Sequence, residues 1–325
     1  MSFASDVRRG LGTKPYRLPP HWFYDELGSR LFDAICLLPW YRITRAERRL
    51  LRRAARAMAR GPRPAFVAEL GPGNGEKLTL FLEDLGGAPP VLLVDISHEA
   101  LAASTARLAK AGFGRVAAVR GTYEAGLARI AHERPKRGRA LVLFLGSNMG
   151  NFEPPRAARF LKDVRSALEP GDGLLLGADL VKPEKDLLLA YDDPLGVTAA
   201  FNRNVLARMN RELAADIDLT SFAHRAVWNA GEGRMEMSLV SRLAQTVRIP
   251  GARLEVRFRK GESIFTEASY KYVSEDLRKR VEAAGFAARR HFEDRAAGYA
   301  LTLFTAVAGP AQHLRGYAHA SCVSG

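Results

Sequence analysis

The chain has 325 residues, of which 47% are hydrophobic and 26% are charged, a composition typical of globular proteins. No apolar run approaches the roughly 20 residues of a membrane span, and residues 1–20 contain no apolar core of a secretory signal. The only cysteines are Cys36 and Cys322, which excludes a disulfide framework and a cysteine-based zinc site. We therefore expect a cytoplasmic protein without a membrane partner.

Residues 1–45 contain aromatic residues and prolines but no repeating strand and helix pattern, so we expect them to pack as a cap. Residues 45–64 are predicted to form an arginine-rich helix with Leu50, Leu51 and Ala54 on one apolar stripe. The net charge of +14 is concentrated here. A solvated arginine face is the ordinary interpretation, and a nucleic-acid-binding helix is the alternative from another functional class. We expect no nucleic-acid partner.

Short apolar runs alternate with helical segments from residue 65 to about residue 181. The runs are FVAEL, VLLVDI, VAAVRG, ALVLFLG and GLLLGADL. Continuous apolar runs of this length, separated by helices, are typical of buried parallel strands with crossover connections. This part of the sequence predicts an α/β fold.

The pattern changes after residue 182. A helical stretch over 184–215 precedes alternating segments broken by GEG and PGA turns, which predicts antiparallel strands. A helix capped by Ser274 and a closing strand, YALTLFTAVA, then resume the α/β pattern. We expect one discontinuous unit of residues 46–181 and 272–308, a second unit of residues 1–45 and 182–271, and a flexible tail over 309–325.

The stretch FVAELGPGNGEKLTLFL places a glycine-rich turn between a predicted strand and a predicted helix. Gly71, Gly73 and Gly75 allow positive φ angles and a close approach of a ligand, while the free amides at a helix start favour a negative group. Asp95 ends the next strand, where a carboxylate can accept hydrogen bonds from two ribose hydroxyls. The dinucleotide fingerprint is absent because Glu76 replaces its last glycine. A different nucleotide-like cofactor is implied.

The spacing E-x-G-x-G-x-G resembles motif I of the seven-strand S-adenosylmethionine-dependent methyltransferases, and the resemblance would place Glu69 near the sulfonium of the cofactor. After the fourth strand comes SNMGNFEPP rather than the [N/D]-P-P-[Y/F] sequence of enzymes that methylate nucleic-acid bases. Asn151 in this loop would orient a small polar substrate, although an asparagine here is ordinarily a turn former.

The chain more specifically resembles the histidine Nα-methyltransferases of ergothioneine biosynthesis, which trimethylate free histidine to hercynine. The supporting runs include LPPHWFYDELGSRLFDAICLLPWY, ELGPGNGEK, LFLGSNMGN, AYDDPLGVTAAFNRNVLARMNREL, GRMEMSL and FTEASYKY. The resemblance implies a seven-strand Rossmann-like class I methyltransferase domain with a second α+β domain formed by the N-terminal segment and the insertion. It implies histidine and its mono- and dimethyl forms as the small-molecule substrates.

Carried over by position, the resemblance implies that Gly71, Gly73, Lys77 and Asp95 hold S-adenosylmethionine. Lys77 alone would ordinarily be a surface charge. After the third strand the family usually has Asp-Phe or a similar pair at the adenine, whereas this chain has Thr122 and Tyr123. A threonine hydroxyl or a tyrosine ring would replace part of that contact.

The resemblance also implies the substrate contacts. Tyr41 would lie between cofactor and substrate, Tyr24 near the amine, and Asn151 with Tyr191 at the carboxylate. Tyr41 and Tyr24 would be the catalytic residues. Tyrosines at such positions are ordinarily packing residues.

Glu267 and Ser269 would bind the imidazole, and Met237 would form part of the same wall. A carboxylate that accepts an imidazole N–H discriminates against amino acids without that donor. Taken alone, Glu267 in an alternating strand would face solvent and Met237 would be core.

Methyl transfer to an amine requires no metal, and no histidine pair has a metal-ligand spacing such as H-x-x-x-H. We expect catalysis mainly by positioning, in a monomer without a metal. The sequence leaves the proton acceptor open. It also leaves open a methyltransferase for another small amine or amino acid, which would keep the cofactor residues and use Glu267 differently.

Overall fold

The computed structural model describes residues 2–308, so the predicted flexible tail lies outside the described residues. Within them, a seven-stranded sheet has the order β11-β12-β5-β4-β1-β2-β3. Its strands are β1 (Phe66–Leu70), β2 (Val91–Asp95), β3 (Val116–Arg120), β4 (Ala140–Phe144), β5 (Gly173–Asp179), β11 (Phe286–Asp294) and β12 (Tyr299–Ala306). The first five pair in parallel, and β12 pairs antiparallel with both β5 and β11. This confirms the predicted Rossmann-like class I fold.

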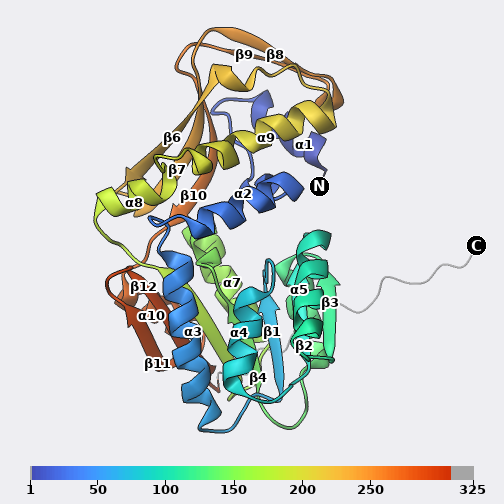
Figure 1. The fold of residues 1–325 in the computed structure, drawn as a ribbon, viewed down its shortest axis with the longest axis vertical. Coiled ribbons are helices and arrows are strands. Elements are labelled where there is room, and N and C mark those ends of the chain that lie inside the picture. The colour runs from blue at the N-terminus through green and yellow to red at the C-terminus, as the bar shows by residue number, and fades with distance from the viewer. Residues whose placement is uncertain (1, 309–325) are drawn as a thin grey trace, which may run out of the picture.

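Helices cover both faces of this sheet, as Figure 1 shows in the lower half of the molecule. One face is covered by α3 (Ile43–Ala59), α4 (Glu76–Leu85) and α5 (His98–Lys110). The other face is covered by α6 (Tyr123–Glu133), α7 (Pro154–Ser166) and α10 (Ser274–Ala283). The apolar residues of the central strands pack into both layers, which explains why these strands read as continuous hydrophobic runs.

A second group of elements stands above this sheet in Figure 1. Its helices are α1 (Phe3–Gly12), η1 (Pro20–Phe23), α2 (Glu26–Leu37), α8 (Glu184–Tyr191), α9 (Val197–Leu213), η3 (Leu219–Ser221) and η4 (Pro250–Ala252). Its strands are β6 (Phe222–Asn229), β7 (Arg234–Ser241), β8 (Gln245–Ile249), β9 (Leu254–Phe258) and β10 (Ser263–Tyr270). They form a sheet of order β10-β7-β6 and a β8-β9 hairpin. One apolar core joins residues 3–41 to residues 187–264.

Three local expectations differ from the structure, two at the edges of the seven-stranded sheet and one at the start of a helix. The run VAAVRG forms β3, which is an edge strand and is largely exposed rather than buried. The opposite edge strand, β11, was not predicted because its sequence FAARRHFED is polar and mostly unburied. Ser274 is not a helix cap: α10 begins at Ser274 itself, and Val273 in the cap position makes no side-chain hydrogen bond. Edge positions carry weak hydrophobic signals because one side of the strand meets solvent.

The arginine face of α3 is largely engaged by acids of neighbouring elements. Arg48 lies 2.9 Å from Glu76 of α4, and Arg49 lies 2.5 Å from Asp294 of β11. The predicted apolar stripe is buried, since Leu50 is only 1% exposed. Across residues 2–308, no helix is both long and apolar enough to cross a membrane.

Candidate active site

The predicted glycine turn follows β1 and has left-handed backbone at all three glycines. The φ angles are 75° at Gly71, 58° at Gly73 and 74° at Gly75. Gly75 is the residue before α4, and a Cβ built on it would lie 2.7 Å from Ser104 Cα of α5. A Cβ on Gly73 would meet no atom within 4 Å, so the turn opens onto free space there. The turn therefore presents bare backbone at a helix start, as an anionic or nucleotide-like ligand requires.

Other predicted residues lie at the same edge of the sheet, where the parallel strands end. Asp95 ends β2 and accepts a hydrogen bond of 2.9 Å from Ser97 N, and burial raises its pKa. A Cβ on Gly71 would lie 3.0 Å from Asn148 Nδ2 and 3.2 Å from the Tyr123 hydroxyl. The structure therefore brings Gly71, Asp95 and Tyr123 together and adds Asn148, which no sequence pattern indicated. Ligands of open α/β sheets bind at this edge.

Thr122 and Tyr123 differ in whether their hydroxyls are available to a ligand. The Thr122 hydroxyl accepts a hydrogen bond of 3.4 Å from Ala125 N and thereby caps α6. The Tyr123 ring packs edge-on against Phe144, with ring centroids 5.4 Å apart, and burial raises the pKa of its hydroxyl. Thr122 thus already has a structural role, whereas Tyr123 places a protonated hydroxyl near the glycine turn.

Glu69 is a buried acid of β1, two residues before the turn. It is fully buried, and neither carboxyl oxygen has a hydrogen-bond partner within residues 2–308. Burial raises the pKa of Glu69 to about 8, against the opposing effect of the Lys77 charge. A buried acid without a partner is rare in proteins and suits a cationic ligand that restores its charge. These features fit S-adenosylmethionine, whose sulfonium carries a positive charge.

The raised pKa of Glu69 predicts a pH-dependent stability of the ligand-free protein. The Glu69 carboxyl has a pKa near 4.5 in the unfolded chain and about 8 in the folded chain. Its stabilising contribution to the free energy of unfolding is therefore complete below pH 4.5 and is lost as the pH rises through 8. The variant Glu69→Gln should lose stability less steeply than wild type between pH 5 and 8. The slopes should differ by up to about 1.4 kcal/mol per pH unit, measured by urea unfolding. Glu83→Gln, an exposed glutamate of α4, should match wild type.

Lys77 does not extend freely from α4. Its ammonium lies 2.8 Å from Glu47 Oε2, and Glu47 is fully buried in α3. Glu47 also accepts hydrogen bonds from Gly146 N, at 2.7 Å, and from the Tyr299 hydroxyl. A contact of Lys77 with a cofactor carboxylate remains a prediction, and Glu47 would share that ammonium. The run ELGPGNGEK gave no sign of Glu47, because the partners of Glu47 come from three distant segments.

The predicted catalytic tyrosines lie where the two groups of elements meet. The Tyr24 ring packs edge-on against Phe32 and Phe201, with centroids 5.6 and 5.5 Å apart, and 36% of its surface stays exposed. Tyr41 contacts both the upper core and the α3 layer of the lower sheet. Burial raises the pKa of both hydroxyls well above 10, and the nearby charge of Glu267 adds to the effect on Tyr24. Both tyrosines are therefore neutral donors at physiological pH.

A bulge in β10 decides where Glu267 points. Phe265 pairs with Ser238 of β7, but Glu267 pairs with Met237, so Thr266 is an extra residue. Thr266 Oγ1 donates to Met237 O at 3.0 Å and stabilises this irregularity. Since directly opposed residues share a face, the bulge places Glu267 on the inner face with Met237, which is 2% exposed. Without it, Glu267 would share the face of Phe265, as simple alternation predicts.

Glu267 lies partly buried on that inner face, and no hydrogen bond or ion pair to its carboxyl occurs within the described part of the chain. Burial raises its pKa to about 7, while the charge of Lys271 opposes the shift. The site therefore contains an acid that lacks a partner, close to Tyr24. An imidazole N–H would satisfy it.

Ser269, on the same inner face, belongs to a buried network. Tyr191 of α8 donates to Ser269 Oγ at 2.8 Å. Lys271 donates to Tyr191 Oη at 2.8 Å, to Ser269 Oγ at 2.9 Å and to Asp179 Oδ2 at 2.9 Å. Because the Tyr191 hydrogen already reaches Ser269, that hydrogen would have to turn for Tyr191 to donate to a substrate carboxylate. Sequence reasoning missed Lys271 and Asp179, which the motifs SYKY and GADL contain.

Asn151 ends the short helix η2 (Asn148–Asn151) and is exposed. Its helix contacts β10, and a Cβ on the neighbouring Gly150 would lie 2.7 Å from Tyr270 O. The structure therefore places Asn151 close to the junction of the two sheets. Its predicted contact with a carboxylate remains a prediction.

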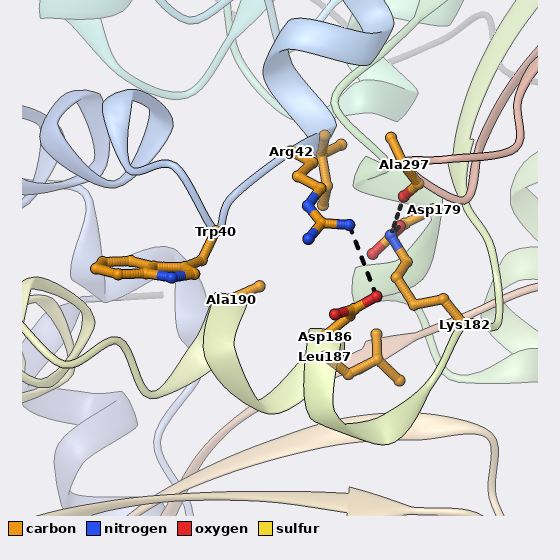
Figure 2. A pocket seen from close by; sticks show the side chains of 9 residues that line it. Trp40, Arg42, Asp179, Lys182, Asp186, Leu187, Ala190 and Ala297 are labelled. Carbon is orange, nitrogen blue, oxygen red and sulfur yellow. Dashed lines mark hydrogen bonds and ion pairs between the residues drawn. The ribbon is translucent and has the colours of Figure 1, made fainter.

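Figure 2 shows a cavity at the junction that no predicted site residue lines. Arg42 and Asp186 form an ion pair of 3.7 Å across it, and Trp40 stands at one end. Lys182 donates to Asp179 Oδ1 at 2.5 Å and to Ala297 O at 2.6 Å. The charged groups that line this cavity are paired with one another or with the backbone. We therefore assign the cavity a structural role at the junction. Within residues 2–308 no cluster of three or more histidine, cysteine or acidic side chains could hold a metal ion.

The substitution Gly75→Ala tests the glycine turn. It should destabilise the protein by more than about 1 kcal/mol and weaken S-adenosylmethionine binding at least ~10-fold, since strain and a clash with Ser104 act together. Unfolding and calorimetric titration measure the two effects. Gly112→Ala is the matched control: its φ is 87°, but a Cβ there would meet no atom within 4 Å. It should cost about 1 kcal/mol and leave binding unchanged. Equal binding losses in both variants would contradict the assignment.

Comparison with known proteins identifies the family of this chain. Residues 3–306 match the family described as histidine-specific methyltransferase, SAM-dependent. Histidine N-alpha-methyltransferases of Mycolicibacterium smegmatis and Mycobacterium tuberculosis are 45% and 41% identical, over 92% and 93% of this chain and 93% and 94% of theirs. Ergothioneine biosynthesis protein 1 of Neurospora crassa is 33% identical over 60% of this chain and 23% of its own length. The chain belongs to the S-adenosylmethionine-dependent, histidine-specific methyltransferase family.

Proposed function

We propose that this protein transfers methyl groups from S-adenosylmethionine to the α-amino group of free histidine, three times in succession, and so forms hercynine for ergothioneine biosynthesis. The single observation that carries the proposal is the Thr266 bulge, which turns Glu267 inward and leaves its carboxyl without a partner. The family membership and the two mycobacterial relatives support the same reaction.

S-adenosylmethionine supplies a methyl group carried on a positively charged sulfur. Gly71, Gly73 and Asp95 would hold it at the ends of β1 and β2, and Lys77 would assist while paired with Glu47. Glu69, whose buried carboxyl has no partner in residues 2–308, would balance the sulfonium charge. Tyr123 would contact the adenine end.

Histidine would bind between the cofactor edge and the inner face of β10. Glu267 would accept the imidazole N–H, Ser269 would contact the second ring nitrogen, and Met237 would pack against the ring. Asn151 and Tyr191 would hold the carboxylate. These contacts orient the substrate amine, and orientation is the main contribution that the site can make.

Tyr24 and Tyr41 would act by positioning the amine. Their raised pKa values keep both hydroxyls protonated, so neither can take the amine proton at neutral pH. The site would therefore bind the amine after its proton has left for solvent. The Tyr24 ring would also favour the permanent cation that the last methylation creates.

The chain would act as a monomer in the cytoplasm, without a metal. The unit of residues 46–181 and 272–308 would bind the cofactor, and the unit of residues 1–45 and 182–271 would bind the substrate. The common core of residues 3–41 and 187–264 supports this division.

Incubation with S-adenosylmethionine and a panel of amino acids, followed by mass spectrometry, tests the proposal. Histidine should gain three successive 14-dalton increments, and chelators should not change the rate. If another amine is methylated while histidine is not, the substrate assignment is wrong although the cofactor assignment stands. Salt-dependent binding of RNA without binding of S-adenosylmethionine would overturn both.

A further inference from the structure

Tyr191 is held at its backbone as well as at its hydroxyl. It is the last residue of α8, and the last carbonyls of an α-helix have no partner within the helix. The carbonyl oxygen of Tyr191 lies 2.8 Å from Nε2 of His224, a residue of β6. Its hydroxyl lies 2.8 Å from Ser269 Oγ and 2.8 Å from the Lys271 ammonium. Two strands that are distant in sequence therefore hold the two ends of this residue.

The direction of the hydrogen bonds at His224 follows from the groups around its ring. One atom of the Asn202 side-chain amide lies 3.1 Å from Ser238 O and 2.9 Å from His224 Nδ1. A backbone carbonyl only accepts, so this atom is the amide nitrogen, whose two hydrogens serve Ser238 O and His224 Nδ1. Since Nδ1 accepts, it carries no hydrogen, and Nε2 donates to Tyr191 O. Two backbone carbonyls thus select one neutral tautomer of His224.

Burial favours this neutral form of His224. The side chain of His224 is 2% exposed, and Asn202 is fully buried. Burial lowers the pKa of His224, although its hydrogen bond to Tyr191 O and the nearby charge of Asp192 oppose the shift. A second proton, on Nδ1, would face the hydrogens of the Asn202 amide. The ring is therefore neutral at physiological pH and remains a donor to Tyr191.

We propose that His224 is a positioning residue that holds the backbone of Tyr191, so that the Tyr191 hydroxyl meets the carboxylate of the substrate. This inference rests on the proposed function, in which Tyr191 contacts that carboxylate. Both ring nitrogens of His224 already have partners, so His224 acts only through Tyr191. The inference concerns where Tyr191 lies, and it holds whichever of the Tyr191 and Ser269 hydroxyls donates to the other.

The substitution His224→Phe removes the donor and keeps a ring. It should raise KM for histidine by about 10-fold, because the Tyr191 carbonyl loses its partner and the end of α8 is released. The value of kcat and the Kd of S-adenosylmethionine should change by less than about 3-fold. His224→Gln is the conservative variant: its amide nitrogen can take the place of Nε2 and donate to Tyr191 O, so KM should stay within about 3-fold of wild type. Steady-state kinetics and calorimetric titration measure these quantities.

Two further variants separate positioning from general damage. In a Tyr191→Phe background, His224→Phe should raise KM no further, because its effect passes through the Tyr191 hydroxyl. His291→Phe is the control: His291 also bonds through both ring nitrogens, to Thr302 at 2.8 Å and Glu293 at 3.2 Å, but belongs to the edge strand β11. It should leave KM unchanged. Equal increases of KM in His224→Phe and His224→Gln would overturn the proposal, as would independent effects of His224→Phe and Tyr191→Phe.

His224→Phe can fail to fold, so nitrogen-15 NMR of the wild-type protein provides a second measurement. The His224 ring should show a protonated Nε2 and a bare Nδ1 at neutral pH, and its signals are assigned by their loss in His224→Gln. A bare Nε2 or a doubly protonated ring would overturn the proposal. If wild type does not methylate histidine, the proposed function is wrong and this inference falls with it. If Tyr191→Phe raises KM but His224→Phe does not, only this inference is wrong.

Discussion

Replacement of Glu267 by alanine is expected to lower kcat/KM for histidine by about 100-fold while S-adenosylmethionine binding stays within about 3-fold of wild type. The bulge places this carboxyl on the inner face of β10, and without it the imidazole N–H would lose its partner. Amino acids without a ring N–H should lose little, so the preference for histidine should largely disappear. Steady-state kinetics with histidine and leucine, and titration with the cofactor, measure both effects.

Glu236→Ala is the control for this prediction. Glu236 lies on the neighbouring strand opposite Ala268, on the other face of the same sheet, where it bonds with Arg234 at 2.8 Å and Asn229 at 3.0 Å. Its loss should change kcat/KM for histidine by less than about 3-fold. If Glu267→Ala keeps its selectivity for histidine, the imidazole contact is wrong.

The substitution Glu47→Gln is expected to cause the largest loss of stability, about 3 kcal/mol. It removes the counter-ion of Lys77, whose side chain is 25% exposed, from a site where Glu47 itself is fully buried. Removing one partner of a buried pair leaves the other charge poorly solvated and costs about 3–5 kcal/mol. Partial exposure of Lys77 places the expected value at the low end. Urea unfolding at neutral pH gives the free energy directly.

The neighbouring ion pair supplies a control of the same geometry. Arg48 and Glu76 also join α3 to α4, at 2.9 Å, but their side chains are 44% and 34% exposed. Glu76→Gln should change the free energy of unfolding by no more than about 0.5 kcal/mol, because solvent screens an exposed pair. If Glu47→Gln and Glu76→Gln lower the free energy of unfolding equally, burial does not increase the contribution of the Lys77 pair to stability.

The Rossmann-like sheet could be predicted because its signals are local. The runs that form β1, β2, β4 and β5 are apolar apart from the acids Glu69, Asp95 and Asp179, since helices cover both faces of those strands. Its two edge strands were harder: β3 was expected to be buried and β11 was not expected at all, because an edge strand has no uniform pattern of burial.

The glycine turn and the inner face of β10 also differ in how far the sequence predicts them. Gly71, Gly73 and Gly75 have positive φ angles, which glycine adopts readily. The turn could therefore be predicted from the sequence alone. The resemblance pointed to Glu267, but its inward direction depends on the Thr266 bulge, which exists only when β10 pairs with β7. Strand alternation alone would have turned that carboxylate away.

The amino-acid sequence by itself determined the fold class, the glycine turn and the acid at the end of β2, because each depends on residues adjacent in the chain. Only the tertiary structure decided which buried charges meet. Glu47 reaches Lys77 from another helix, and Lys271 reaches Asp179 across more than 90 positions of sequence. Desolvation makes each of these charges costly unless a partner arrives from a distant segment, and only the folded chain brings that partner within reach.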